Sequence, residues 1–231
     1  MSDAAPEGQP LVVASGLKKA YQIGDRRLEV LRGVSLQVSR GEFVALRGAS
    51  GAGKSTLLHL LGGLDQPDSG RIDFEGTELS GRSLSSLAEF RNRHVGIIFQ
   101  AYHLLADLTA LENVYLPARM ARVPGNEART RAEALLRRVG LGDRMTHRPS
   151  QMSGGEQQRV AIARCLVNSP VLVLADEPTG NLDSHTGDGV MDLLLELRKE
   201  HQMTLVIATH DSRVAARAER EVRLVDGLAV G

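Results

Sequence analysis

Short apolar runs of strand length recur along this chain and alternate with stretches of helical periodicity. Val171–Ala175 and Thr204–Ala208 contain no polar alternation, which is typical of strands buried on both faces of a parallel sheet. The segment Gly189–Glu200 between them has helical periodicity, so the three segments predict a βαβ unit. Glu42–Arg47 predicts a further apolar strand, and the leucines of Ser55–Gly62 predict a helix after it.

Three further segments predict an antiparallel β region around the glycine-rich stretch Gly48–Thr56. They are Leu11–Ala14, Leu28–Val38, which is punctuated by Gly33, and Arg71–Phe74. Short β-rich runs bounded by glycine and polar residues are typical of hairpins and meanders. The amino-terminal third of the chain is therefore predicted to combine a buried strand with a smaller antiparallel sheet.

The middle of the chain is predominantly helical in its periodicity. Helical spacing extends from Leu84 to about Arg138 and is interrupted by a strand-like run at Val95–Phe99. The cluster Pro124-Gly125-Asn126 predicts a break in the helical stretch. A further helix follows Ser153-Gly154-Gly155 and runs through Val160–Leu166.

Length and composition favour a single domain. The chain has 231 residues, enough for one sizeable core, and we expect this domain over residues 11–231 with a helical subdomain at approximately 88–160. Residues 1–10 are small, polar and proline-containing, and predict a disordered leader. Lysine plus arginine and aspartate plus glutamate each number 28, so no net charge attracts nucleic acid, and no nucleic-acid partner is expected.

The cysteine content and the hydropathy bear on the compartment. Cys165 is the only cysteine, which excludes an internal disulfide, and its apolar surroundings predict a buried structural thiol. No apolar run approaches the roughly 20 residues that span a bilayer. The amino terminus has no signal-peptide pattern, so we expect a soluble chain in a reducing compartment.

The stretch GASGAGKST matches the G-x-x-x-x-G-K-[ST] phosphate-loop pattern and lies between a predicted strand and a predicted helix. Its glycines permit backbone conformations in which successive N–H groups turn toward phosphate oxygens, and the helix dipole favours the same anion. Lys54 would reach the β- and γ-phosphates, and the Ser55 hydroxyl would bind Mg²⁺. A chance glycine-rich turn is the structural alternative. The loop comprises Gly48, Ala49, Ser50, Gly51, Ala52, Gly53, Lys54, Ser55 and Thr56.

Two carboxylates follow the buried run VLVLA. Asp176 and Glu177 stand where a buried strand ends, and carboxylates are costly there unless a cation or a reaction needs them. Asp176 is suited to hold Mg²⁺, directly or through water, and Glu177 to polarise an attacking water, because phosphoryl transfer depends on positioning and charge neutralisation. The alternative is a plain strand-end turn with solvated acids, which the glycine loop makes less favourable.

The stretch Met152-Ser-Gly-Gly-Glu-Gln-Gln-Arg159 resembles the signature sequence of the ATP-binding-cassette (ABC) family, whose nucleotide-binding subunits the chain resembles over nearly its whole length. Ser153 with the N–H groups of Gly154 and Gly155 would form a second anion site at a helix start. The resemblance implies an α/β fold with a P-loop ATPase core on a parallel sheet, an antiparallel β subdomain and a helical subdomain. It also implies that ATP and Mg²⁺ are the cofactors.

Other family elements occur in the expected order and carry roles that the resemblance implies. Gln100 matches the Q-loop glutamine that contacts Mg²⁺ and the lytic water, and Asn181-Leu182-Asp183 matches the D-loop. His210 matches the switch histidine, which contacts the γ-phosphate, and Tyr21 matches the aromatic residue that stacks on adenine. Each is a common loop or strand residue when it stands alone, so the prediction depends on their ordered co-occurrence.

The resemblance further implies partners. In this family the signature closes over the nucleotide of a second subunit in a head-to-tail dimer, so Ser153, Gly154, Gly155, Glu156 and Asp183 are predicted to act on the partner's ATP. The chain departs from the commonest signature at Met152, where leucine is usual, and at Glu156, where glutamine is usual. Both departures leave the Ser-Gly-Gly core intact. Integral membrane permease subunits would be the further partners, which implies a cytoplasmic, peripheral location on the inner face of the membrane.

The stretches STLLHLLGGLD, HLLADLTALENV, HRPSQMSGGE and ADEPTGNLDS resemble the lipoprotein-releasing (LolD) type and the macrolide-exporter (MacB) type of the family, the former more closely. The segment Ala101–Met120 would lie where a membrane subunit docks. Its leucines at 104, 105, 108 and 111 could face that partner or the subdomain core, and most are predicted to be core.

Two other classes of function are compatible with parts of this sequence. ABC ATPases of DNA repair or translation are one alternative, but no long coiled coil fits between Gln100 and Ser153, and the chain has room for one cassette only. A P-loop kinase is another, but it needs no signature and would need an acceptor site that the sequence does not show.

Arginines 213, 217 and 220 have helical spacing and predict a solvent-exposed stripe on one helix.

Overall fold

A computed structural model describes residues 10–230, which divide into two compact units. The described residues of the first unit are 10–88 and 203–230, and the second unit comprises residues 89–202. The predicted leader lies outside the described residues, except that Pro10 begins the first strand. Within residues 10–230, no helix has both the length and the apolar character needed to cross a bilayer.

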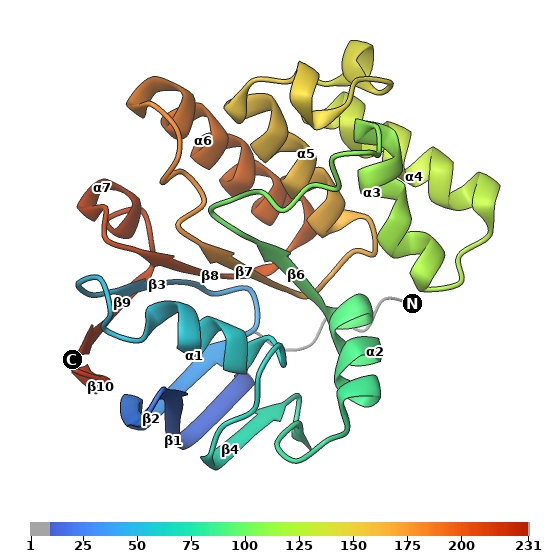
Figure 1. The fold of residues 1–231 in the computed structure, drawn as a ribbon. Helices are drawn as coiled ribbons and strands as arrows, with labels where there is room; N and C mark the ends of the chain where they lie inside the picture. Colours follow the sequence, from blue (N-terminus) through green and yellow to red (C-terminus); the bar gives the residue numbers. More distant parts are fainter. Residues whose placement is uncertain (1–9, 231) are drawn as a thin grey trace. The chain divides into compact units, whose positions relative to one another are not determined.

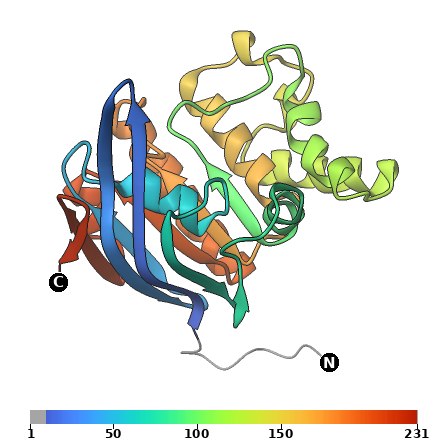
Figure 2. The same cartoon turned by 60° about the horizontal axis from the view of Figure 1, so that its bottom comes forward.

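The first unit contains the predicted antiparallel sheet (Figure 2). Its strand order is β2-β1-β4-β5. Inward-facing residues of β2, such as Leu36 and Val38, are buried and alternate with exposed polar residues, as expected for a sheet with one covered face. The strands are β1 (Pro10–Ile23), β2 (Arg26–Ser39), β4 (Ser69–Phe74) and β5 (Thr77–Glu78).

The same unit contains a mostly parallel sheet built on β3 (Phe43–Arg47). This strand pairs in parallel with β8 (Thr204–Thr209) on one side and with β9 (Arg220–Val225) on the other, and β9 pairs antiparallel with β10 (Leu228–Val230). Every residue of β8 is buried, as the unbroken apolar run predicted. Helix α1 (Lys54–Leu61) contacts β8 as well as β1 and β2, so it lies between the two sheets of this unit (Figures 1 and 2).

The predicted arginine stripe is wrong. Helix α7 extends only over Ser212–Ala215, and Arg220 begins strand β9. The alternation in β9 buries Val222 and Leu224, and the pairing of this strand with β3 overrides the helical spacing of the three arginines. The strand pair β9–β10 was not predicted at all.

The second unit contains a parallel strand pair and the predicted helices. Strand β6 (Val95–Ile98) pairs with β7 (Leu172–Asp176), and Ile98 lies opposite Ala175. Helix α3 packs against α4 and α5, and α5 contacts α6 and β6 (Figure 1). The predicted helical stretch Leu84–Arg138 is thus divided into α2 (Leu84–His94), which begins in the first unit, α3 (Ala110–Met120) and α4 (Gly125–Arg138). The two helices predicted after it are α5 (Gly154–Leu166) and α6 (Ser184–His201), and short 3₁₀ turns lie at Gly142–Arg144 and Pro149–Gln151.

The leucines that precede and begin α3 do not form core. None of the leucines at 104, 105, 108 and 111 is buried, and Leu105 is 49% exposed. The buried side chain of Asn113 explains the arrangement, because its amide oxygen accepts from the Leu105 N–H and its nitrogen donates to the carbonyls of Leu105, Leu108 and Thr109. This asparagine satisfies the loop backbone, so the loop is ordered without burying its leucines.

Cys165 is expected to be unreactive in the native protein. The residue is half-buried as a whole, its sulfur packs so closely on Gly96 that a Cβ there would lie 2.2 Å from Sγ, and burial raises the pKa of the thiol to about 12. Because the thiolate is the reactive form, the native chain should react with an aromatic disulfide reagent at least about a hundredfold more slowly at pH 8 than the urea-unfolded chain. Equal rates in the two states would contradict this burial.

Candidate functional site

The glycine loop connects β3 to α1 and depends on the absence of side chains. Gly53 precedes α1 in the left-handed conformation, with φ 99°. A Cβ on Gly53 would lie 2.7 Å from Leu31 Cδ2 and 3.0 Å from the Val30 carbonyl oxygen. Only glycine fits such a position without strain, so the close approach of β2 fixes the conformation of the loop at the start of the helix.

Lys54 is buried although it carries a charge. It is only 7% exposed, and its Nζ donates to the carbonyl oxygens of Gly48 at 2.9 Å and Ala49 at 3.0 Å. Burying an ammonium group is costly unless it is compensated, and neutral carbonyls compensate it only in part. The loop therefore holds a cation next to the first-turn N–H groups of a helix, an arrangement that favours an anion.

The loop and His210 line one cavity of about 560 Å³. The register of the parallel strands explains their proximity, because Arg47 lies opposite Thr209 and the loop and His210 directly follow these two residues. The structure thus brings residues 48–52 together with His210, although they are far apart in the sequence. Ser55 is exposed at the start of α1, and Thr56 is half-buried.

One wall of this cavity was not predicted from the sequence. The β9–β10 hairpin forms this wall with Arg223, Leu224, Val225 and Asp226. Arg47 of β3 also lines the cavity. Gly48 packs on this hairpin so closely that a Cβ would lie 2.4 Å from the Leu224 carbonyl oxygen. The alternating run REVRLV followed by Asp226-Gly227 is a hairpin signal that could have identified it.

Tyr21 lies in the same unit but is not among the residues that line the cavity. It is 36% exposed on β1, and its hydroxyl donates to Asp65 Oδ2 at 2.9 Å. Burial, followed by the hydrogen bond to Asp65, raises the pKa of Tyr21, while a hydrogen bond with the Thr56 side chain lowers it in part. The phenol therefore lies near Thr56, the last residue of the glycine loop.

In the second unit, Gln100, Asp176 and Glu177 gather at the carboxyl ends of β6 and β7. Because Ile98 pairs with Ala175, the residues that follow these two positions emerge at the same edge of the strand pair. Gln100 Nε2 donates to Asn181 Oδ1 at 3.2 Å, and Asn181 Nδ2 donates to the Gln100 carbonyl at 2.9 Å. Asp176 is half-buried, and Glu177 adopts φ 46°, a conformation that is costly for a residue with a side chain.

The predicted signature begins helix α5 with a reciprocal capping box. Ser153 is exposed, its Oγ accepts from the Glu156 N–H, and its own N–H donates to Glu156 Oε2 at 2.8 Å. The hydrogen bond from the Ser153 backbone is the main cause that lowers the pKa of Glu156, and Arg144 lies 3.5 Å from this carboxylate. The N–H groups of Gly154 and Gly155 belong to the first helical turn, which has no intrahelical acceptors for them.

The signature lies beside the segment that carries the predicted D-loop. A Cβ on Gly155 would lie 2.5 Å from Thr186 Cγ2, and one on Gly154 would lie 3.3 Å from Leu182 Cδ2. Asp183 caps helix α6 by accepting from the Thr186 N–H at 3.0 Å. Within the second unit, the structure thus brings the signature and the D-loop together.

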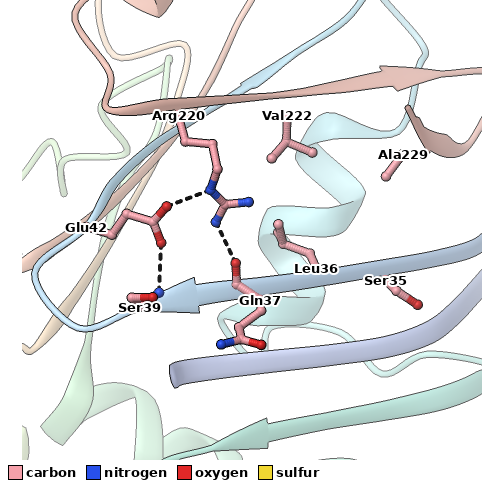
Figure 3. Close-up of a pocket in the computed structure, with 8 residues that line it drawn as sticks. All are labelled: Ser35, Leu36, Gln37, Ser39, Glu42, Arg220, Val222 and Ala229. Atoms are coloured by element: carbon pink, nitrogen blue, oxygen red, sulfur yellow. Dashed lines mark hydrogen bonds and ion pairs between the residues drawn. The ribbon is translucent and has the colours of Figure 1, made fainter. Parts of the chain in front are cut away.

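A second cavity, of about 390 Å³, lies in the first unit (Figure 3). Its charged residues neutralise one another, because Arg220 donates to Glu42 Oε1 and to the Gln37 carbonyl, each at 2.6 Å. Glu42 Oε2 also accepts from the Ser39 N–H at 2.8 Å. None of the predicted site residues is among those lining this cavity, and its polar groups serve to join β2 to β9.

Comparisons with known proteins agree with this geometry. Residues 31–180 match the family described as ABC transporter. The chain is 50% identical over 222 residues to the macrolide export ATP-binding/permease protein MacB 1 of Aeromonas hydrophila subsp. hydrophila, covering 96% of the chain but only 34% of that protein. It is 50% identical over 220 residues to the lipoprotein-releasing system ATP-binding protein LolD of Geobacter metallireducens, covering 95% of the chain and 98% of that protein.

A solved structure is similar in both fold and sequence. The ATP-binding cassette MJ0796, a dimer in a post-hydrolysis state bound to ADP and Pi, superposes with a TM-score of 0.88 at 40% identity, covering 95% of this chain and 97% of that one. The α/β cassette fold predicted from the sequence is therefore confirmed. Since the family match covers more than half of this chain's residues, the chain belongs to the ABC transporter family.

Proposed function

We propose that this chain is the ATP-binding and ATP-hydrolysing subunit of an ABC transporter, which powers a membrane partner through ATP-driven closure of a dimer. The observation that carries the proposal is the glycine loop with its buried Lys54, which lines one cavity with His210 in a chain of this family. The loop N–H groups and Lys54 would bind the phosphates, and His210 would contact the γ-phosphate. Tyr21 would stack on adenine through its exposed ring.

The second unit would supply further catalytic residues. Glu177 would orient and polarise the attacking water, and Gln100 would contact that water. Ser55, Asp176 and Gln100 would hold Mg²⁺, since they offer the hydroxyl, carboxylate and amide oxygens that this ion prefers. Gln100 fits this role because its Nε2 is engaged by Asn181, so the amide oxygen is the atom it can offer. When bound, Mg²⁺ neutralises charge that develops on the phosphates.

The nucleotide would be shared with a second copy of the chain. Ser153, Gly154 and Gly155 would bind the partner's γ-phosphate, with Glu156 fixing the helix start and Asp183 lying beside it. The exposure of Ser153 and the unpaired donors of the first helical turn support this role. The cassette MJ0796 is described as a dimer, which supports a head-to-tail pair here.

The partner would be integral membrane subunits, with this chain bound at the cytoplasmic face of the membrane. MacB 1 combines ATP-binding and permease parts in one protein, of which this chain spans about a third, whereas the LolD relative is matched over almost its whole length. We infer that the transported process is lipoprotein release or MacB-type export, since relatives of both types are about 50% identical to this chain. Leu105 and Met120 are 49% and 69% exposed, and each would be an apolar contact for such a partner.

Purification from membranes tests this proposal. Tagged chain extracted in mild detergent should bring down integral membrane proteins, and the complex should hydrolyse ATP. Leu105→Glu should lose the membrane partner and keep ATP hydrolysis by the isolated chain, because a charge would be desolvated in the apolar contact. Leu84→Glu is the matched control, since Leu84 is also exposed, at 76%, but lies in the other unit. A complex with DNA or ribosomes and no membrane protein would contradict the transport function.

A further inference from the structure

A network of polar contacts fixes the position of the Tyr21 side chain. The Tyr21 hydroxyl donates to Asp65 Oδ2 at 2.9 Å, and Lys19 Nζ donates to Asp65 Oδ1 at 2.8 Å. Lys19 Nζ also donates to the Gln66 carbonyl at 2.7 Å and lies 5.2 Å from the centre of the Tyr21 ring. The Lys19 side chain is only 11% exposed, so this ion pair is more shielded from water than a surface pair.

Asp65 is itself fixed to the helix that begins in the phosphate loop. The N–H groups of Leu64 and Asp65 donate to the carbonyl of His59 in the last turn of α1, and Asp65 Oδ1 accepts from the Gln66 N–H at 2.7 Å. Burial raises the pKa of Asp65, but the hydrogen bonds from Lys19, Gln66 and Tyr21 outweigh it and lower the pKa below its ordinary value. The carboxylate is thus ionised and its orientation is determined at neutral pH.

Strand β1 is irregular at this point and is held by the same segment. The register with β2 shifts between Lys19 and Ala20, and the Ala20 N–H donates to Asp68 Oδ2 at 2.8 Å. Asp68 in turn donates its N–H to the Lys18 carbonyl at 2.9 Å. A register shift changes the direction of the side chains that follow it. Residues 65–68 therefore determine both the path of the strand near Tyr21 and the position of the phenol.

We propose that Lys19 and Asp65 are positioning residues that hold the Tyr21 ring in the orientation in which it receives the nucleobase. This inference rests on the proposed function, in which Tyr21 stacks on adenine. An aromatic side chain on an exposed hairpin would otherwise lose rotamer freedom when the base binds, and fixing its hydroxyl beforehand removes part of that cost. Because Lys54 begins α1 and Asp65 is bound to its last turn, one rigid helix of about 12 Å sets both the phosphate end and the base end of the site.

The test compares a nucleotide with a ligand that has phosphates but no base. Binding of ATP and of inorganic tripolyphosphate is measured by calorimetry for Asp65→Ala, Tyr21→Phe and the double variant. Each single variant should weaken ATP binding about threefold to tenfold, the range for a lost hydrogen bond, and leave tripolyphosphate binding unchanged. The double variant should be no weaker than the weaker single one, because both changes break the same contact.

A matched control and a reference variant separate the possible failures. Asp73→Ala removes another carboxylate that accepts from a cation, Arg71, in the same sheet, and should change neither ligand's affinity. Unchanged ATP affinity in Asp65→Ala, or an equal loss for ATP and tripolyphosphate, would overturn the positioning role. Tyr21→Ala should weaken ATP binding by about fivefold to a hundredfold, the range for stacking on a base. If Tyr21→Ala binds ATP normally, the adenine role of Tyr21 fails, whatever Asp65→Ala shows.

Discussion

Replacing Glu177 by glutamine should lower ATP hydrolysis by about a hundredfold to ten-thousandfold and leave ATP binding intact. The substitution keeps the size of the side chain and removes the carboxylate that is proposed to polarise the attacking water. The backbone should stay in place, because the Glu177 carbonyl accepts from the Gly180 N–H at 3.0 Å and the preceding strand is paired with β6. Steady-state phosphate release and calorimetric ATP binding measure the two quantities separately.

The same variant should accumulate as a dimer with ATP. If hydrolysis opens the dimer, a chain that binds ATP but hydrolyses it slowly remains closed, and size-exclusion chromatography with Mg²⁺ and ATP should show the larger species. Glu196→Gln is the matched control, since Glu196 lies exposed on α6 and pairs with Arg138 at 3.2 Å. It should hydrolyse ATP at the normal rate and show no trapped dimer. Full turnover in Glu177→Gln would show that the proposed role of Glu177 is wrong.

The sequence predicted those parts of the fold that depend on local pattern. The unbroken apolar runs predicted β7 and β8, because burial on both faces leaves no polar alternation to conceal the strand. The glycine loop was predicted because its conformation needs glycine at fixed positions, as the left-handed Gly53 illustrates. Gln100 and His210 follow strand ends, so the strands locate them once the family pattern names them.

The parts that were missed depend on contacts between distant segments. Arg223 and Asp226 reach the phosphate-loop cavity only because β9 pairs with β3, and no local pattern gives that pairing. Asn113 orders the loop before α3 through three backbone carbonyls, so the leucines predicted to be core are half-buried or, at Leu105, exposed. Asp65 lies far from Tyr21 in sequence, and only the folded first unit brings the carboxylate to the phenol.

Replacing Ser153 by aspartate should abolish ATP hydrolysis and ATP-dependent dimerisation, while the isolated chain still binds ATP. Aspartate caps helices as well as serine does, so α5 should remain intact. Its negative charge would repel a γ-phosphate presented by a second copy, and the loss of the hydroxyl donor alone is worth about a hundredfold in similar sites. Thr109→Asp is the matched control, because Thr109 caps α3 through the same reciprocal box with Glu112, and this variant should hydrolyse ATP normally.

Mixing two inactive chains tests whether the site is shared. Lys54→Ala should fail to bind ATP because it removes the cation buried in the glycine loop, whereas Ser153→Asp should fail only at the signature. In a mixed dimer, the intact loop of the Ser153→Asp chain faces the intact signature of the Lys54→Ala chain, so one complete site forms. Phosphate release by the mixture should exceed the sum of the two variants measured alone. If it does not, the signature does not act on the nucleotide of a second copy, and Ser153 must support hydrolysis within its own chain.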